Sequence, residues 1–384
     1  MTRILVVYGT RPEAIKLAPV VKALERRRDR CVVALCATAQ HRELTDQAQR
    51  WFDLTPHFDL NLMEPGQDLN HLTSRLFAAL DDVIVRARPD WVIVQGDTTS
   101  AMVAALAGFH RGVRVGHVEA GLRTGDLARP FPEEMNRRVA DLVASAHFAP
   151  TARAEAALIG EGVPREKIFL TGNTVVDALH VVAARLGQAD ATRASEVLVT
   201  VHRRESFGPA MRGVFEGVAD LARAYPSVRW VFPVHPNPAV EAPARAILGS
   251  AANVSVVPPL DYADLVSHLR RCRFVMTDSG GIQEEAPTFG TPVLVLRETT
   301  ERPEGVRAGV ARLIGVDRHR VVAEASALLD DSAALARMTV AGNPYGDGLA
   351  SDRIASILTG QPWTRFEFAA TENEKDGRLA PTVR

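Results

Sequence analysis

The segment that sets the fold stands at the start of the chain, where Ile4-Leu5-Val6-Val7-Tyr8 runs directly into Gly9-Thr10-Arg11-Pro12-Glu13. A short apolar run of this kind predicts a strand that is buried on both faces of a sheet. Gly9 permits a tight turn after the strand, and Pro12 suits the first turn of a helix whose pattern continues to about Arg28. A strand, a turn and a helix in this order predict a parallel α/β sheet.

The same alternation continues along most of the 384 residues, and partway along the chain it begins again. Apolar strands separated by amphipathic helices predict an α/β protein with two doubly wound, Rossmann-like sheets. The strands expected in the first sheet are residues 4–8, 31–37, 91–95, 113–119 and 168–171. Those expected in the second sheet are residues 197–201, 229–234, 254–257, 274–277 and 292–296.

A helix and a small polar segment separate the two sets of strands, between about residues 176 and 196. We therefore expect a first Rossmann-like domain at residues 1–180 and a second at residues 195–350. The remaining segment, residues 351–384, becomes polar and loses its periodicity from about residue 362, which predicts a frayed tail.

Composition excludes several classes of partner. Lys and Arg total 45 against 46 Asp and Glu, so bulk charge favours neither a nucleic acid nor a membrane. The 3 cysteines lack metal-ligand spacing and are expected to be buried, reduced thiols, so we expect no metal site. No apolar run has the length of a membrane-spanning helix, and the first strand is too short for a signal peptide. We expect a cytoplasmic protein.

Cations stand at the start of the first helix, beside the edge where doubly wound sheets bind ligands. Arg11 and Lys16 either hold a diphosphate at the helix N-terminus or pair locally with Glu13. Asp97 follows the strand at residues 91–95, and it is either the N-cap of the next helix or a catalytic group.

Carboxylates follow the next strand of the first set. Glu119 ends an apolar run, where an uncompensated charge is costly, so it is either paired, for example with Arg123, or functional. Glu133 and Glu134 stand in the first turn of a helix after Pro132, where acidic residues favour the helix dipole. Stabilisation of the helix dipole explains one acidic residue at this place well, but it explains two less well.

The second set of strands ends in residues suited to phosphate. His202 and Arg203 follow its first strand, and His235 follows the next, although the prolines beside His235 also mark an ordinary turn. The strongest local signal is Asp278-Ser279-Gly280-Gly281, because small residues before a helix let backbone N–H groups approach phosphate oxygens. No Gly-x-Gly-x-x-Gly follows the first strand, and no Walker-type loop is present.

Together these segments resemble the non-hydrolysing UDP-N-acetylglucosamine 2-epimerases. The matching segments are residues 9–16, 96–99, 116–124, 132–134, 172–174, 202–205, 278–281, 300–304 and 343–348. Each alone is unspecific, but they occur in the family's order over nearly the whole chain, and that order is specific.

The resemblance implies two Rossmann-like domains of glycosyltransferase-B type with UDP in the interdomain cleft, and final helices that return to the first domain. It implies a homodimer, a UDP-sugar substrate and no cofactor. The implied reaction is reversible C2 epimerisation of UDP-N-acetylglucosamine to UDP-N-acetylmannosamine, through anti elimination of UDP, a 2-acetamidoglucal intermediate and re-addition of UDP. Many bacteria use the product for surface polysaccharides.

The resemblance also implies roles for individual residues. Asp97, Glu119 and Glu133 match the acid/base carboxylates, and His202 matches a group near the diphosphate and the glycosidic oxygen. It leaves open which carboxylate serves which face of C2. The residues that match UDP contacts are Arg11, Lys16, Ser279, Gly280, Gly281, Glu285 and Arg302.

Many bacterial members are regulated by a second substrate molecule beside the active site. Gln40, Arg203 and His235, with Glu133, match positions used there. Two departures count against strong activation, because Glu43 replaces a glutamine and Gly66 an arginine of the regulated members.

Three alternatives remain. A glycosyltransferase shares the architecture, because a fold alone does not define a function, but it does not require this set of acidic residues. A hydrolysing epimerase would release free N-acetylmannosamine. A catalytically inactive UDP-sugar sensor would have lost the carboxylates, whereas Asp97, Glu119 and Glu133 are all present. The sequence leaves the exact UDP-sugar and the pathway open.

Overall fold

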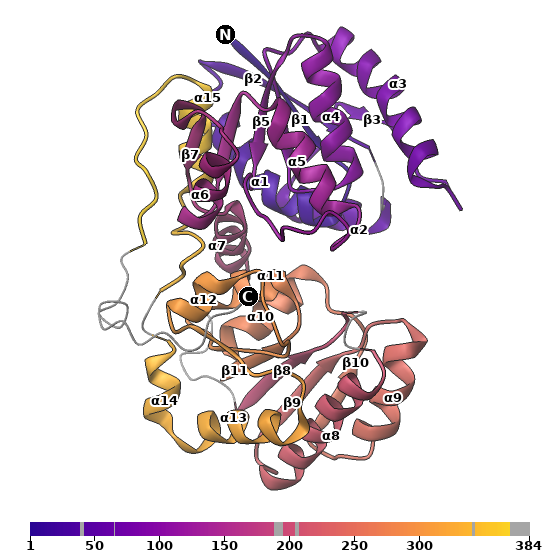
Figure 1. Ribbon diagram of the computed structural model, residues 1–384, viewed down its shortest axis with the longest axis vertical. Coiled ribbons are helices and arrows are strands. Elements are labelled where there is room, and N and C mark those ends of the chain that lie inside the picture. Colours follow the sequence, from indigo (N-terminus) through magenta and orange to yellow (C-terminus); the bar gives the residue numbers. More distant parts are fainter. Residues whose placement is uncertain (39–41, 65, 188–194, 204–206, 340–341, 369–384) are drawn as a thin grey trace. The chain divides into compact units, whose positions relative to one another are not determined.

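A computed structural model describes residues 1–38, 42–64, 66–187, 195–203, 207–339 and 342–368 (Figure 1). The chain divides into two compact units. The first contains Met1–Val181 together with Tyr345–Glu367, and the second contains Val182–Pro344. The stretch Tyr345–Glu367 thus returns to the first unit, which consists of two separate stretches of sequence.

Over the described residues, the first unit contains a seven-stranded parallel sheet in the order β3-β2-β1-β4-β5-β6-β7. The order reverses between β1 and β4, which is where doubly wound sheets bind ligands at the carboxyl ends of their strands. The strands are β1 (Thr2–Tyr8), β2 (Cys31–Ala37), β3 (Phe58–Asp59), β4 (Trp91–Gln95), β5 (Arg114–Val118), β6 (Ala146–Ala149) and β7 (Ile168–Leu170).

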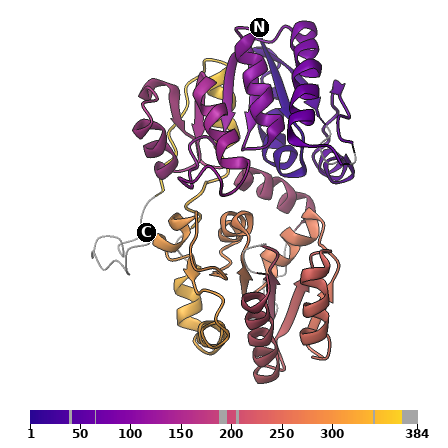
Figure 2. The ribbon, with the colours of Figure 1, turned by 45° about the vertical axis from the view of Figure 1, so that its right-hand side comes forward.

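Helices flank this sheet (Figures 1 and 2). They are α1 (Arg11–Glu25), α2 (Arg42–Phe52), α3 (Leu69–Ala87), α4 (Thr99–His110), α5 (Glu133–Val143), α6 (Ala152–Gly160), the 3₁₀ turn η1 (Arg165–Lys167), α7 (Thr174–Leu186) and α15 (Ala350–Leu358). Helices α3, α4 and α5 pack side by side, and α1 packs against α2 and the returning helix α15.

The second unit contains a six-stranded parallel sheet over its described residues, in the order β10-β9-β8-β11-β12-β13. Its strands are β8 (Glu196–Thr200), β9 (Arg229–Pro233), β10 (Val254–Val257), β11 (Phe274–Thr277), β12 (Val293–Val295) and β13 (Ala311–Leu313). Its helices are α8 (Pro209–Ala224), α9 (Pro238–Leu248), α10 (Tyr262–Arg271), α11 (Gly280–Glu285), the 3₁₀ turn η3 (Ala286–Phe289), α12 (Pro303–Arg307), α13 (Arg318–Asp330) and α14 (Ser332–Arg337). The order reverses between β8 and β11.

The predicted α/β class is confirmed, and all ten expected strands are present within a residue or two of their expected bounds. Three short strands were not predicted: β3, β6 and β13. Each sheet has its own apolar core; Leu5, Val92 and Val103 lie wholly buried in the first, and Phe215 and Trp230 in the second.

The cysteines lie in the interior of the two units. Cys31, Cys36 and Cys272 are all free and buried, as predicted, and burial raises the pKa of the Cys36 thiol to about 12. Such a thiol is inert near neutral pH. Within the described residues, no helix is both long enough and apolar enough to span a membrane. In the same part of the chain, no group of His, Cys, Asp and Glu side chains is arranged to hold a metal ion.

Candidate active site

A buried glutamate at the start of α1 joins the loops that follow β1 and β4. Glu13 Oε2 accepts hydrogen bonds from the backbone N of Gly9 at 3.0 Å and of Thr10 at 2.7 Å. Its Oε1 accepts from Thr98 Oγ1 at 2.6 Å. Glu13 therefore caps α1 and ties together the loops that follow β1 and β4.

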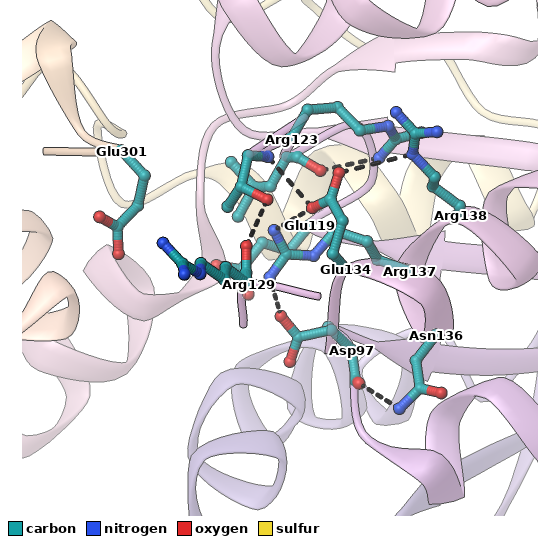
Figure 3. Close-up of polar contacts among 12 residues, drawn as sticks. Asp97, Glu119, Arg123, Arg129, Glu134, Asn136, Arg137, Arg138 and Glu301 are labelled. Atoms are coloured by element: carbon teal, nitrogen blue, oxygen red, sulfur yellow. Dashed lines mark hydrogen bonds and ion pairs between the residues drawn. The ribbon is translucent and has the colours of Figure 1, made fainter. Parts of the chain in front are cut away.

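Asp97 lies in the loop that Glu13 fixes. The N-cap of α4 is Thr98, which excludes capping of this helix as the role of Asp97. The Asp97 carboxylate instead pairs with Arg137 of α5, and its backbone carbonyl accepts from Asn136 Nδ2 at 2.9 Å (Figure 3). The Asp97 side chain remains 32% exposed, so a reactant can reach this carboxylate.

Glu119 follows β5 in a left-handed backbone conformation, with φ at 67°. Such a conformation is unfavourable for a side chain of this size and is found where surrounding contacts impose it. Its carboxylate is buried against Lys16, whose Nζ lies 2.8 Å from Oε1 and 2.7 Å from Oε2. Gln95 and Asn173 donate to the same carboxylate, Asn173 at 3.4 Å. The partner of Glu119 is therefore Lys16, and the expected Arg123 pairs elsewhere.

The two glutamates at the start of α5 differ in their surroundings. Glu134 is wholly buried; it lies 3.1 Å from Arg137 and 3.4 Å from Arg138 and accepts from the backbone N of Thr124 at 3.1 Å. Glu134 thus supports the loop before α5 (Figure 3). Glu133 is only partly buried, and its Oε2 has no hydrogen-bond partner among the described residues. The contacts of Glu134 give it a structural role, whereas Oε2 of Glu133 is buried without such a contact among the described residues.

A buried histidine lies beneath these loops. His117, on β5, has Nδ1 at 2.6 Å from Asp141 Oδ1 and Nε2 at 2.8 Å from the carbonyl oxygen of Gly96. Burial lowers the pKa of His117, but Asp141 and the Gly96 carbonyl outweigh it, and the net pKa is raised. Arg123 donates to the other oxygen of Asp141 at 2.8 Å and also pairs with Glu161.

In the second unit, Asp278 at the end of β11 organises the loop after β8. Its buried Oδ2 accepts from the backbone N of His202 at 2.9 Å and of Arg203 at 2.7 Å. His202 Nδ1 lies 3.3 Å from Oδ1, and the ring of His202 stacks on that of His235 with centroids 6.1 Å apart. The packing around His202 lowers its pKa, with Arg203 and His235 adding to this effect and Asp278 opposing it. A neutral imidazole is thereby favoured.

The glycine loop follows Asp278 directly. Ser279 is the N-cap of α11, and its Oγ accepts from the backbone N of Ile282 at 3.5 Å. Gly280 is buried beside Arg203 and Glu301, whereas a Cβ added to the exposed Gly281 would meet only Ser279 Oγ, at 3.8 Å. The loop therefore presents backbone at Gly281 with open space in front of it.

Ion pairs hold the arginines that were predicted to bind in the second unit. Arg302 pairs with the buried Glu284, the residue before the partly buried Glu285. Arg203 Nη2 donates to Glu301 Oε1 at 3.1 Å. Burial of Glu301 is outweighed by Arg302, Arg297 and Arg203, which lower its pKa to about 2. Gln40 lies outside the described residues.

Sequence reasoning missed several residues of these clusters. Gln95 ends the apolar run of β4, as Glu119 does after β5, so the same signal was available for it. His117 stands inside an apolar strand, which is a signal for a buried, partnered histidine. Arg137 gave no signal, because only the position of α5 shows that it faces Asp97.

The sequence model of the UDP-N-acetylglucosamine 2-epimerase family matches residues 22–359. The chain belongs to this family. A UDP-N-acetylglucosamine 2-epimerase of Salmonella typhimurium is 47% identical over 369 residues, which is 93% of this chain and 98% of that protein. The resemblance stated from the ordered segments is thus confirmed.

Solved structures of the epimerase family share the fold. The crystal structure of the Neisseria meningitidis enzyme bound to UDP-GlcNAc has a TM-score of 0.87 and 40% identity, covering 94% of this chain and 100% of that one. A glycosyltransferase of kitacinnamycin matches with a TM-score of 0.61 at 15% identity, covering 94% and 98% of the two chains. At that identity the likeness shows the fold alone, and it agrees with the predicted glycosyltransferase-B type.

Proposed function

We propose that this chain is a non-hydrolysing epimerase that interconverts UDP-N-acetylglucosamine and UDP-N-acetylmannosamine. One observation carries the proposal: in a chain of this family, Asp97 follows β4 and Glu119 follows the adjacent strand β5, and Glu119 is paired with Lys16 of α1. A transferase that shares only the fold has no need of such a set of carboxylates. The Neisseria meningitidis relative, solved with UDP-GlcNAc, supports the choice of substrate class.

The chemistry requires a carboxylate because the hydrogen on C2 of the sugar is only weakly acidic. In the proposed first step a base removes the C2 proton, and the C2–H electrons form a C1=C2 double bond. The C1–O bond breaks at the same time, so UDP departs on the opposite face of the ring and 2-acetamidoglucal remains. UDP oxygen then adds back to C1 while an acid delivers a proton to the other face of C2. The sequence is redox-neutral and needs no cofactor.

We assign the proton transfers to Asp97, Glu119 and Glu133. Asp97 is accessible, and its ion pair with Arg137 of α5 holds the carboxylate in place. Glu119 is held in one orientation by Lys16, Gln95 and Asn173, and preorganised groups of this kind assist proton transfer most. Which of them serves which face of C2 stays open.

The second unit is proposed to hold UDP. Gly280 and Gly281 would offer backbone N–H groups to the diphosphate, and Ser279, whose own N–H donates to Thr277 Oγ1 at 2.9 Å, would offer its hydroxyl. His202, whose neutral form is favoured, would lie beside the diphosphate and the glycosidic oxygen. Glu285 would accept hydrogen bonds from the ribose, while Arg302 would balance phosphate charge. The family resemblance supports Arg11 as a further contact of UDP.

Lys16 was expected among the UDP contacts as well. Its short contacts to both oxygens of Glu119 support a different principal role, as the counter-ion of a catalytic carboxylate. We also propose, from the family resemblance, a cytoplasmic homodimer. Light scattering on the purified protein tests the dimer directly.

Incubation with UDP-N-acetylglucosamine in deuterium oxide tests the function. The proposal predicts UDP-N-acetylmannosamine that carries deuterium at C2, together with deuterium in the recovered substrate. Free N-acetylmannosamine and UDP as the main products would instead identify a hydrolysing epimerase. Absence of turnover and exchange, with UDP still bound, would favour the transferase or the sensor.

A further inference from the structure

A charged pair below the proposed active site contacts both loops that carry its carboxylates. His117 on β5 is fully buried, and Asp141 on α5 is nearly so. The ring joins the two elements, because Nδ1 lies 2.6 Å from Asp141 Oδ1 while Nε2 lies 2.8 Å from the carbonyl oxygen of Gly96. Gly96 immediately precedes Asp97, so this carbonyl determines how the Asp97 peptide is turned.

The contacts of the ring require a charged histidine. Both ring nitrogens face an acceptor, and a neutral imidazole can donate from only one of them. The negative charge of Asp141 is also balanced by Arg123, whose Nη2 lies 2.8 Å from Oδ2. Burial of Asp141 is outweighed first by His117 and then by Arg123 and His147, and its pKa is lowered to about 2. The pair is therefore an imidazolium and a carboxylate at neutral pH.

The carboxylate also reaches the second loop. Asp141 Oδ2 accepts from the backbone N of Gly121 at 3.2 Å, two residues after Glu119. Gly121 has φ at 85°, and a Cβ there would lie 2.3 Å from the carbonyl oxygen of Ala154. The backbone at Gly121 thus packs too closely on Ala154 to admit a side chain, and its hydrogen bond to Asp141 ties this turn, with the left-handed Glu119, to α5.

We propose that His117 and Asp141 are positioning residues, whose buried ion pair holds the Gly96–Asp97 and Glu119–Gly121 segments in the geometry that proton transfer at C2 requires. The pair acts through its neighbours: His117 has no exposed surface with which to meet a substrate. The inference rests on the proposed function, since it assigns the pair to the same reaction.

Two neutral substitutions of His117 separate its two contacts. In His117→Asn the amide takes the place of Nδ1 and can still donate to Asp141, but the donor to Gly96 is lost. In His117→Gln the amide reaches the place of Nε2 and can still donate to Gly96. Both variants lose the charge, and asparagine is one methylene smaller than glutamine, so the Tm of each variant is measured beside its kcat to separate a packing defect from the lost contact.

The account predicts a larger loss of kcat for His117→Asn, about 10²-fold, than for His117→Gln, about 10-fold, because small displacements of a catalytic group have effects of this size. The KM for UDP-N-acetylglucosamine and the Kd for UDP should stay within about 3-fold of the unaltered protein, since the contacts are remote from UDP. Equal losses of kcat, or losses that follow Tm in both variants, would show a structural role only.

Two measurements are independent of turnover. With ¹⁵N-labelled histidine, the His117 ring should carry protons on both nitrogens at neutral pH, and a neutral ring would overturn the inference without any variant having to fold. In crystal structures, the Asp97 carboxylate should be displaced in His117→Asn and unmoved in His117→Gln; an unmoved Asp97 in both also contradicts it. If the unaltered protein does not epimerise, the proposed function fails, while these two measurements still decide whether the pair positions Asp97.

Discussion

Lys16 Nζ lies 2.8 Å from Oε1 and 2.7 Å from Oε2 of Glu119, so a helix of the first unit supplies the counter-ion of a carboxylate that follows β5. The Glu119 side chain is 4% exposed and that of Lys16 is 17% exposed. A pair this deeply buried depends on both partners, because removing one leaves the other charge without compensation.

Lys16→Met is expected to lower kcat for epimerisation by at least about 10²-fold, because Glu119 loses the cation that holds it in place. The Kd for UDP, measured by calorimetry, should change by less than about 3-fold. Lys22→Met is the matched control on the same helix, since Lys22 pairs with the exposed Glu25. A large loss of UDP affinity with little change in kcat would show instead that Lys16 contacts the diphosphate of UDP.

Asp97→Asn should abolish deuterium exchange at C2 while leaving UDP binding intact, because the amide cannot accept the proton. Mass spectrometry of recovered substrate measures the exchange. Asp126→Asn, in an exposed loop of the same unit, is the control and should exchange normally. Loss of UDP binding in Asp97→Asn would undo the assigned role.

Gly281→Ala should weaken UDP binding by about 10-fold or more, because the methyl group would stand where the backbone meets phosphate. The fold should be unaffected, as the nearest atom to the added Cβ is Ser279 Oγ at 3.8 Å. Gly160→Ala, also with open space around the added Cβ, is a control without effect on UDP. Unchanged affinity in Gly281→Ala would remove this loop from the UDP site.

Asp177 should make the first unit less stable as pH rises from about 4 to 7. Burial raises its pKa to about 6 from an ordinary value of 3.8, although the backbone N of Ser351 donates to it at 2.7 Å. The folded chain therefore holds more protons than the unfolded chain in this window, and the free energy of unfolding falls as pH rises through it.

The measurement is the difference in unfolding free energy between the unaltered protein and Asp177→Asn at pH 4.5 and 7.5. The unaltered protein should lose about 2 kcal/mol relative to the variant, because a shift of about two pKa units is worth about 3 kcal/mol in full and most of it is lost between these two pH values. Asp82→Asn, a substitution of the same kind at an exposed position of α3, is the matched control. A constant difference for Asp177→Asn would show that this carboxylate is not perturbed.

Initial rates should depend hyperbolically on UDP-N-acetylglucosamine, and the reverse reaction should start without added activator. Arg203, one of the positions matched to the family's regulatory site, already donates to Glu301. Gly66, which stands in place of an arginine of the regulated members, has no side chain with which to bind a second substrate molecule. Steady-state rates in both directions check this. A sigmoidal curve, or a reverse reaction that starts only when UDP-N-acetylglucosamine is added, would show that activation by a second substrate molecule is retained.

The sheets could be predicted because their long central strands are continuous apolar runs between helices. β13 (Ala311–Leu313) and β3 (Phe58–Asp59) were missed because short edge strands are stabilised by their neighbours more than by their own pattern. β6 carries a buried histidine, His147, in the middle of only four residues, which breaks the apolar signal.

The site could be predicted only as far as chain position reveals it. The residues that follow strands, such as Asp97 and Glu119, were found because all carboxyl ends of a parallel sheet meet at one edge. The partners were not: Lys16 and Glu119 are 103 positions apart, and Arg137 is 40 positions from Asp97. Only the packing of α1 and α5 on the sheet brings these charges together.

Positional isotope exchange tests the central claim, that the bond between C1 and UDP is broken and remade during epimerisation. UDP-N-acetylglucosamine labelled with ¹⁸O in the bridge between C1 and the β-phosphate is incubated with the protein, and ³¹P NMR follows the label. The account predicts that the label moves into the non-bridging β-phosphate positions on the time scale of C2 deuterium exchange. Epimerisation with C2 exchange while all the ¹⁸O stays in the bridge would contradict it.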